Sequence, residues 1–255
     1  MSDSTVYLIT GAARGIGFEL VKLYSADPSN VIIAGVRDTT SPTALLEVAK
    51  SSQAKIHVVK IVAGDEEGNK AAAKEVEGLV GRVDVLWANA GISDTPKPVL
   101  QINHGDMQRH WETNTLGPLY LFQSFYPLLL KSTKAEKKFI ITSTLAGSLT
   151  AAVPFPITAY GSSKAAINFV GIHIHQEHAE KDKVAVVMVH PGMVSTDMGN
   201  VGIESFGGHE KVASFGVTIL TPVQSATYVK EVADKATIES HGGKFFNYDG
   251  EGLPW

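Results

Sequence analysis

The chain has 255 residues, and its 22 lysines and arginines against 26 aspartates and glutamates give a net charge of −4. No basic run is dense enough to follow a phosphate backbone, which argues against a nucleic-acid partner. Because the chain has no cysteine, disulfides, thiolate metal sites and thiol nucleophiles are excluded.

The share of hydrophobic residues, 44%, and of charged residues, 19%, is that of a globular protein. An α/β fold of this length is commonly one unit, so we expect a single domain over residues 1–255. The N-terminal segment carries an acidic residue early and lacks the apolar stretch of a signal peptide. The longest apolar runs, such as NFVGIHI, are too short to cross a bilayer, and we therefore expect a cytoplasmic protein.

Short runs rich in Val and Ile alternate along the chain with helical patterns. Most of them are continuously apolar, which is typical of strands covered on both faces. Six such strands are predicted at residues 5–10, 30–36, 55–62, 83–89, 138–143 and 183–190. Helices are expected between them and near 209–216 and 222–234, with a seventh strand at 244–248. This order predicts a doubly wound α/β fold of the Rossmann type, with a mainly parallel sheet and helices on both faces.

Directly after the first strand, the sequence TGAARGIG places Gly11, Gly15 and Gly17 in the spacing G-x-x-x-G-x-G, with a helix behind them. A sharp turn, a close approach of the backbone to a pyrophosphate and tight packing of helix on sheet each leave no room for a Cβ. The helix N-terminus supplies free N–H groups and a partial positive charge. We interpret the segment as a dinucleotide-binding turn, with a purely structural turn as the alternative.

The end of the second strand selects between the two nicotinamide cofactors, because an acidic side chain there bonds the ribose 2′-hydroxyl of NAD and repels a 2′-phosphate. The sequence IIAGVRD places Gly35 where the acid is expected and Arg37 two residues later. A guanidinium binds a phosphate with paired hydrogen bonds, and Arg14 in the glycine turn offers a second cation. NADP(H) is the predicted cofactor, unless Arg37 is only a surface arginine beside Asp38.

The segment AYGSSK places Tyr160 and Lys164 four positions apart, on one face of a predicted helix. An ammonium near a phenol favours the phenolate, so we expect the pKa of Tyr160 to fall toward neutrality. Such a tyrosine can give a proton to a carbonyl oxygen or take one from an alcohol. The pair by itself is common on surface helices, and its meaning depends on its surroundings.

Four motifs, in order, make the chain resemble the short-chain dehydrogenase/reductase family over nearly its whole length. TGAARGIG resembles the cofactor turn of that family, and ANAG at 88–91 resembles the motif after its fourth strand. AYGSSK resembles its active-site helix, and HPGMVSTDM at 190–198 resembles the segment after its sixth strand.

The resemblance implies a catalytic set of asparagine, serine, tyrosine and lysine. Tyr160 and Lys164 match it directly, the lysine also holding the nicotinamide ribose hydroxyls. Asn114, in HWETNTLGP, matches the helix asparagine that holds a proton-relay water. The alternative for Asn114 is an asparagine that merely interrupts a helix.

The same resemblance implies the cofactor contacts. Asn89 steadies the centre of the sheet behind the cofactor, and Gly91 lets the cofactor pass close by. Val194 and Thr196 contact the nicotinamide carboxamide and the pyrophosphate. The expected cofactor-binding residues are Gly11, Arg14, Gly15, Ile16, Gly17, Arg37, Asn89, Ala90, Gly91, Tyr160, Lys164, Pro191, Gly192, Val194 and Thr196.

The sequence departs from the family at the catalytic serine. The usual pair of serines is replaced by Ser143 and Thr144, and counting from LAG places the catalytic hydroxyl on Thr144, 16 residues before Tyr160. Threonine keeps the hydroxyl donor but adds a methyl group that narrows the pocket. Ser143 is the alternative donor, and because neighbours on a strand point to opposite faces, only one of the two should reach the site.

A second departure concerns the adenine of the cofactor. Members of the family often have an aspartate near the position of Val62 that bonds the adenine amino group, and valine cannot do so. Backbone groups, or Asp65 after a local shift, would have to replace it.

The insert GSLTAAVPFPITAY and the ending FFNYDGEGLPW most resemble the part of the family that contains fungal norsolorinic-acid ketoreductases and Sniffer-type carbonyl reductases. This implies an NADPH-dependent reductase of ketones or aldehydes, including bulky or aromatic ones, with alcohol oxidation as the reverse reaction. Candidate residues of an apolar substrate pocket, each of which could instead serve packing, are Ile92, Leu145, Phe155, Met193 and Met198.

The glycine-rich stretch after the sixth strand predicts a mobile substrate loop near 193–216. The resemblance further implies a homodimer or homotetramer. The alternative function is a non-catalytic NADP(H)-binding sensor or scaffold, which would not need Tyr160 and Lys164.

The nine histidines do not predict a metal site. In GIHIHQEH only His175 and His178 share a helix face, and no cluster completes a tetrahedral zinc set, so we expect solvated helix histidines. A serine–lysine hydrolase is disfavoured because the sequence has no G-x-S-x-G turn.

Overall fold

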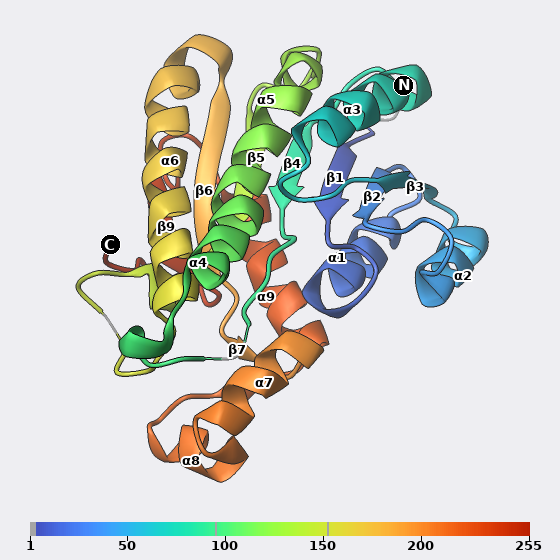
Figure 1. Ribbon diagram of the computed structural model, residues 1–255. Coiled ribbons are helices and arrows are strands. Elements are labelled where there is room, and N and C mark those ends of the chain that lie inside the picture. The colour runs from blue at the N-terminus through green and yellow to red at the C-terminus, as the bar shows by residue number, and fades with distance from the viewer. Residues whose placement is uncertain (1–3, 95, 152) are drawn as a thin grey trace.

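A parallel sheet in the order β3-β2-β1-β4-β5-β6-β9 forms the centre of the protein (Figure 1). The computed structural model describes residues 4–94, 96–151 and 153–255. The seven strands are β1 (Val6–Thr10), β2 (Val31–Val36), β3 (Lys55–Lys60), β4 (Val85–Ala88), β5 (Lys137–Thr142), β6 (Val184–His190) and β9 (Lys244–Asn247). All neighbouring pairs in this sheet are parallel, which confirms the predicted fold class.

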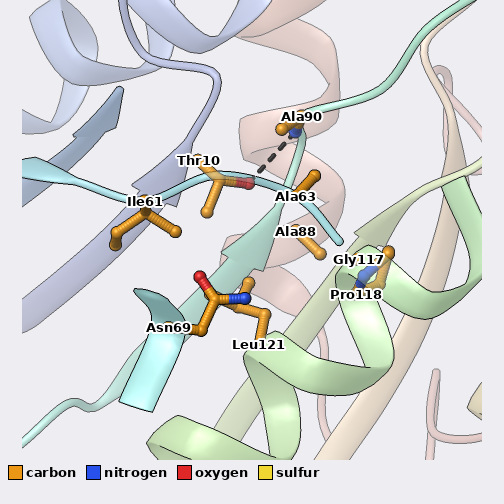
Figure 2. A pocket seen from close by; sticks show the side chains of 9 residues that line it. All are labelled: Thr10, Ile61, Ala63, Asn69, Ala88, Ala90, Gly117, Pro118 and Leu121. Atoms are coloured by element: carbon orange, nitrogen blue, oxygen red, sulfur yellow. Dashed lines mark hydrogen bonds between the residues drawn. The ribbon is translucent and has the colours of Figure 1, made fainter. Parts of the chain in front are cut away.

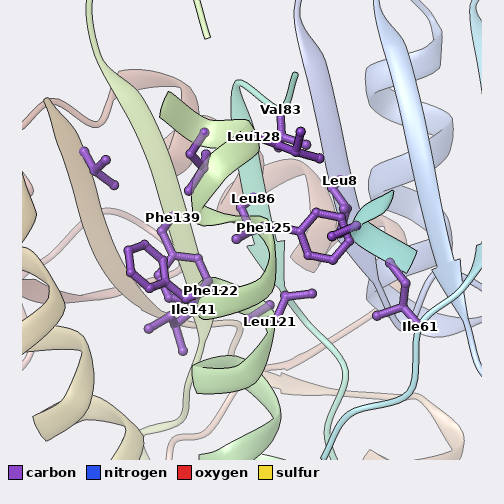
Figure 3. Packing of buried hydrophobic residues seen from close by; sticks show 14 of the residues in the cluster. Leu8, Ile61, Val83, Leu86, Leu121, Phe122, Phe125, Leu128, Phe139 and Ile141 are labelled. Atoms are coloured by element: carbon purple, nitrogen blue, oxygen red, sulfur yellow. The ribbon is translucent and has the colours of Figure 1, made fainter. Parts of the chain in front are cut away.

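Helices cover both faces of the sheet, so each strand is apolar on both sides. On one face lie α1 (Gly15–Ser25), α2 (Thr43–Ser51) and α9 (Pro222–Lys235); on the other lie α3 (Glu66–Val80), α5 (Gly117–Leu130) and α6 (Thr158–Asp182). Neighbouring residues of β1 divide between the two cores: Leu8 packs in the cluster with Phe125, and Ile9 in the cluster with Leu20. Figure 3 shows the first cluster, in which Phe125 lies close to Leu8.

Helix α5 is the last part of a continuous helical segment that contains two shorter elements before it. It follows α4 (His104–His110) and a π-helix, η2 (Trp111–Leu116). Asn103 and Asp106 begin α4 with a reciprocal capping box. π-Helical turns are rare and are frequent at functional sites, which draws attention to the residues that η2 carries.

The glycine-rich segment after β6 is mostly helical, whereas the sequence predicted a mobile loop near 193–216. The chain forms β7 (Met193–Val194), α7 (Asp197–Ser205), α8 (Gly208–Ser214) and β8 (Ile219–Leu220). Thr196 caps α7 by accepting a hydrogen bond from the backbone nitrogen of Gly199 at 3.0 Å. A Cβ on Gly199 would lie 1.8 Å from the carbonyl oxygen of Val194, so packing, not flexibility, requires glycine there.

Two further features bear on the predictions. Phe155, a candidate pocket residue, stacks on Phe206 beside α7, with ring centroids 3.8 Å apart. Within the described ranges, no helix combines the length and the apolar character that crossing a membrane requires.

The helix histidines are less solvated than we expected. The Nδ1 atom of His178 lies 2.6 Å from the carboxylate of Asp182, and His175 packs so closely on Gly242 that a Cβ there would lie 2.3 Å from its ring. Contacts between α6 and neighbouring segments, which a single helix pattern does not reveal, explain the difference.

Two glycine substitutions test the packing argument. Gly78→Ala should raise the free energy of unfolding by about 0.5–1 kcal/mol, because glycine is a poor helix former and nothing lies within 4 Å of the added Cβ in α3. Gly17→Ala should lower it by more than about 1 kcal/mol, because its Cβ would lie 2.3 Å from the carbonyl oxygen of Gly11. Urea unfolding measures both, and equal effects would contradict the argument.

Candidate active site

The glycine turn between β1 and α1 has the geometry that its spacing predicts. Gly11 and Gly15 have φ values of +67° and +57°, in the left-handed region that favours glycine. A Cβ on Gly17 would lie 2.3 Å from the carbonyl oxygen of Gly11 and 2.6 Å from Nδ2 of Asn89. Gly11 and Gly15 are therefore required by their backbone angles, and Gly17 by close packing. The N-terminus of α1 faces the carboxyl edge of the sheet.

The ANAG motif lies against this turn, at the point where the strand order reverses between β1 and β4. The backbone nitrogens of Asn89 and Ala90 donate to Oγ1 of Thr10, each at 3.0 Å, and the Asn89 amide donates to the Thr10 carbonyl. A crevice outside the carboxyl ends of the strands at such a reversal is where open α/β sheets bind ligands. Ile16 packs against the core beneath the turn.

The end of β2 presents a free cation. Arg37 is exposed and forms no ion pair with any residue that the structure describes. Asp38 instead accepts hydrogen bonds from Thr40 and Ser41, which lower the pKa of its carboxyl to about 2. Arg37 and Asp38 are therefore neighbours that form no ion pair with each other, and the role of Arg37 stays a prediction.

The segment after β6 closes the crevice from the other side. Arg14 of the glycine turn forms a 2.7 Å ion pair with Asp197 at the start of α7. A Cβ on Gly15 would lie 3.3 Å from Cγ2 of Thr196, so the predicted pyrophosphate contact adjoins the turn. Val194 is buried nearby.

Two residues shape the bend that leads into this segment. Pro191 accepts a hydrogen bond from Ser225 on α9 through its carbonyl oxygen. Gly192 has a φ of +84°, and a Cβ there would lie 2.9 Å from Leu220. The bend therefore needs glycine both for its backbone angle and for its packing.

Three predicted residues from separate motifs meet at Gly91. A Cβ there would lie 3.1 Å from Oδ1 of Asn114 and 3.6 Å from Nζ of Lys164. Asn114 is fully buried in η2; its amide nitrogen donates to the Ile92 carbonyl and to Oγ of Ser163, and its Oδ1 accepts from the Ile92 backbone nitrogen. Asn114 thus joins three segments of the site and does not merely interrupt a helix.

Thr144, and not Ser143, is the hydroxyl beside the tyrosine. Ser143 donates to Oδ1 of Asn168 on α6 at 2.6 Å. The hydroxyl of Thr144 instead lies near the phenol of Tyr160, whose pKa it lowers, and it accepts a hydrogen bond from the backbone nitrogen of Ala146.

The expected lowering of the pKa of Tyr160 was wrong. Burial raises the pKa of Tyr160 to about 12, and the neighbouring hydroxyl of Thr144 opposes this only in part. Burial also lowers the pKa of Lys164 to about 8, and its Nζ donates to the Thr142 carbonyl at 2.7 Å. Desolvation disfavours both charged forms and is the largest cause of both pKa shifts, so the phenol is protonated at neutral pH.

Two supporting residues were missed by the sequence argument. Ser163 accepts from Asn114 and donates to the carbonyl oxygen of Tyr160 at 2.7 Å. His110 places its ring edge-on to Tyr160, with ring centroids 6.4 Å apart, and accepts a hydrogen bond through Nε2 from the Asp94 backbone. The position of Ser163 within AYGSSK could have indicated the first; no local pattern indicates the second.

The alternative adenine partner is already engaged. Asp65 is the N-cap of α3 and accepts a hydrogen bond from the backbone nitrogen of Gly68 at 2.9 Å. Val62 offers no polar side chain, and Asp65 uses Oδ1 of its carboxylate to cap α3.

Comparisons with known proteins agree with this geometry. A family model described as short chain dehydrogenase matches residues 5–204. An uncharacterized oxidoreductase of Schizosaccharomyces pombe is 38% identical over 257 residues, covering 100% of this chain and 99% of the relative. A short-chain dehydrogenase of Neurospora crassa is 33% identical over 264 residues, covering 100% and 99%.

Solved structures of carbonyl reductases share the fold of this chain over nearly its whole length. The NADPH-bound carbonyl reductase from chicken fatty liver is similar with a TM-score of 0.86 and 27% identity, covering 99% of each chain. The carbonyl reductase Sniffer of D. melanogaster has a TM-score of 0.85 and 25% identity, covering 98% of this chain and 99% of the other. The chain belongs to the short-chain dehydrogenase/reductase family of oxidoreductases, whose members use NAD(P)H.

Replacing the buried lysine tests the pKa argument. Its pKa falls from 10.5 to about 8 on folding, a difference that corresponds to a cost of about 3 kcal/mol at neutral pH. Lys164→Met should therefore be more stable than the wild type at pH 7. The unfolded chain keeps its proton up to about pH 10.5, so wild-type stability gains on the variant as the pH rises from 8 to 10.5. Thermal unfolding of both proteins measures this, and a constant difference across the window would contradict it.

Proposed function

We propose that the protein is an NADPH-dependent carbonyl reductase that reduces a ketone or aldehyde, with Tyr160 as the proton donor. The observation that carries the proposal is the hydroxyl pair of Thr144 and Tyr160. Lys164 and Asn114, which meet at Gly91, connect this pair to the crevice beside the glycine turn.

The residues present fit a dinucleotide. Gly17 lets α1 pack closely on the glycine turn, Gly91 lies beside Asn114 and Lys164, and the N-terminus of α1 provides N–H groups for a pyrophosphate. Lys164 would hold the nicotinamide ribose, and Thr196 would adjoin the pyrophosphate. When bound, the cofactor supplies the hydride.

The chain's own residues manage the proton. Tyr160, protonated at neutral pH, donates its proton to the carbonyl oxygen as the hydride reaches the carbonyl carbon, which gives the alcohol. Thr144 donates a hydrogen bond to the same oxygen. Lys164 and Asn114 position the groups that return a proton to Tyr160.

Arg37 supports NADPH over NADH. It is exposed and unpaired among the described residues, and at the end of β2 Gly35 replaces the acidic residue that would repel a 2′-phosphate. The similar chicken reductase is described as NADPH-bound. A non-catalytic sensor would need the glycine turn but not the pairing of Thr144 with Tyr160. Assembly into a homodimer or homotetramer stays a prediction.

Removing either hydroxyl tests the mechanism. Tyr160→Phe should lower kcat for ketone-dependent NADPH oxidation by about 10²–10⁴-fold, because the proton donor is lost. Thr144→Val should lower it by about 10²–10³-fold, and Thr144→Ser should restore most of it. Ser143→Ala is the matched control, since that hydroxyl faces Asn168. An unchanged rate in Tyr160→Phe would rule out the mechanism.

Arg37→Ala tests the cofactor preference. Loss of a charge-assisted contact with the 2′-phosphate should lower kcat/KM for NADPH by about 10- to 100-fold. NADH is the internal control, and its kcat/KM should change little. The assignment is wrong if the wild-type protein uses NADH more efficiently, or if the substitution leaves the preference as it was.

A further inference from the structure

Asn69 is a buried polar side chain whose hydrogen bonds the fold leaves unmade. It lies in the first turn of α3 with 0% of its surface exposed. Among the buried side chains that the structure describes, it is the one that leaves two polar atoms, Oδ1 and Nδ2, without a partner. Buried amides in folded proteins are almost always hydrogen-bonded to protein or to ordered water, so this one calls for a ligand.

The side chain of Asn69 borders a small cavity (Figure 2). The walls include Ile61 and Ala63 after β3, Ala90 after β4, and Pro118 at the start of α5. The cavity has a volume of about 10 Å³, close to what one water molecule occupies by the same measure. An adenine ring is far too large to enter, and full burial keeps Asn69 from touching a ligand in the crevice directly.

The cavity lies at the edge of the sheet where the dinucleotide is proposed to bind. Ala63 and Ala90 follow the carboxyl ends of β3 and β4, on the same edge as the glycine turn. In the register of β2 with β3, Val36 pairs with Lys60, so Arg37 adjoins the segment that leads to Ala63. If Arg37 binds the 2′-phosphate on the adenine ribose, the adenine lies next to this segment.

The side chains along this segment are apolar or take part in the fold. Val62 and Ala63 are apolar, and the Asp65 carboxylate caps α3 through Oδ1. Asn69 lines the cavity together with Ala63 and Ala90, and both of its amide atoms are without a partner.

We propose that Asn69 and one water molecule that it holds in this cavity form the adenine-facing end of the cofactor site. The water bonds the Asn69 amide on one side and a polar edge atom of the adenine on the other. Water-mediated bonds of this kind are nearly as favourable as direct ones. The proposal rests on the proposed function only as far as dinucleotide binding, and it holds whichever carbonyl compound is reduced.

Binding of the adenine half of the cofactor tests the proposal without any catalytic step. The probe is 2′,5′-ADP, titrated calorimetrically into the full chain. Asn69→Leu has a similar volume without polar atoms and should weaken binding about three- to tenfold, the loss of about one hydrogen bond. Asp65→Ala is the matched control: it should lower the melting temperature through loss of the cap and leave the 2′,5′-ADP affinity unchanged.

Two results would overturn the proposal. In one, Asn69→Leu binds 2′,5′-ADP as tightly as the wild type; in the other, Asp65→Ala loses as much affinity as Asn69→Leu. If Asn69→Leu does not fold, a crystal structure of the wild-type protein with 2′,5′-ADP decides. A water within hydrogen-bond distance of both Asn69 and the adenine supports the proposal, and a dry cavity or a water without contact to the adenine refutes it. Absence of ketone reduction would refute the proposed function and leave these binding results unaffected.

Discussion

The close contact between the glycine turn and the end of β4 is the constraint on which the candidate site depends. The side-chain position of Gly17 has room only for a hydrogen atom, because the Gly11 carbonyl and the Asn89 amide both lie against it. Asn89 is held in turn by Thr10, whose hydroxyl also fixes the backbone of Ala90. The distance of α1 from the sheet, the direction of its free N–H groups and the position of the crevice wall are therefore set by one group of contacts.

Burial governs the protonation states of the proposed catalytic residues Tyr160 and Lys164. The phenol of Tyr160 and the ammonium of Lys164 both lose hydration, and both pKa values move toward the neutral forms. A buried phenol that keeps its proton is suited to donation toward a carbonyl oxygen. Burying these polar groups lowers the free energy of unfolding. Functional sites commonly reduce the stability of a protein in this way.

Local patterns predicted most of the fold, and contacts distant in sequence account for the failures. The helix between β3 and β4 followed from its apolar spacing, but α7 was missed because the glycine at position 199 was interpreted as flexibility instead of close packing. Strand alternation allowed only one of the hydroxyls of Ser143 and Thr144 in the site, and the choice of Thr144 came from counting back from LAG. The raised pKa of Tyr160 and the burial of Asn69 depend on which elements cover them, and the sequence does not show this.

The π-helical turn at Trp111–Leu116 sets the phase between two helical faces that must point in different directions. Downstream, α5 turns Leu121, Phe125 and Leu128 into the core, while upstream Asn114 must reach Ile92 and α6. One residue of an α-helix corresponds to about 100° of rotation. Deleting a single residue from this turn would give a regular helix and swing one face by that angle, so that the apolar face or the asparagine would leave its place. A one-residue insertion thus allows a single helix to serve both the core and the site.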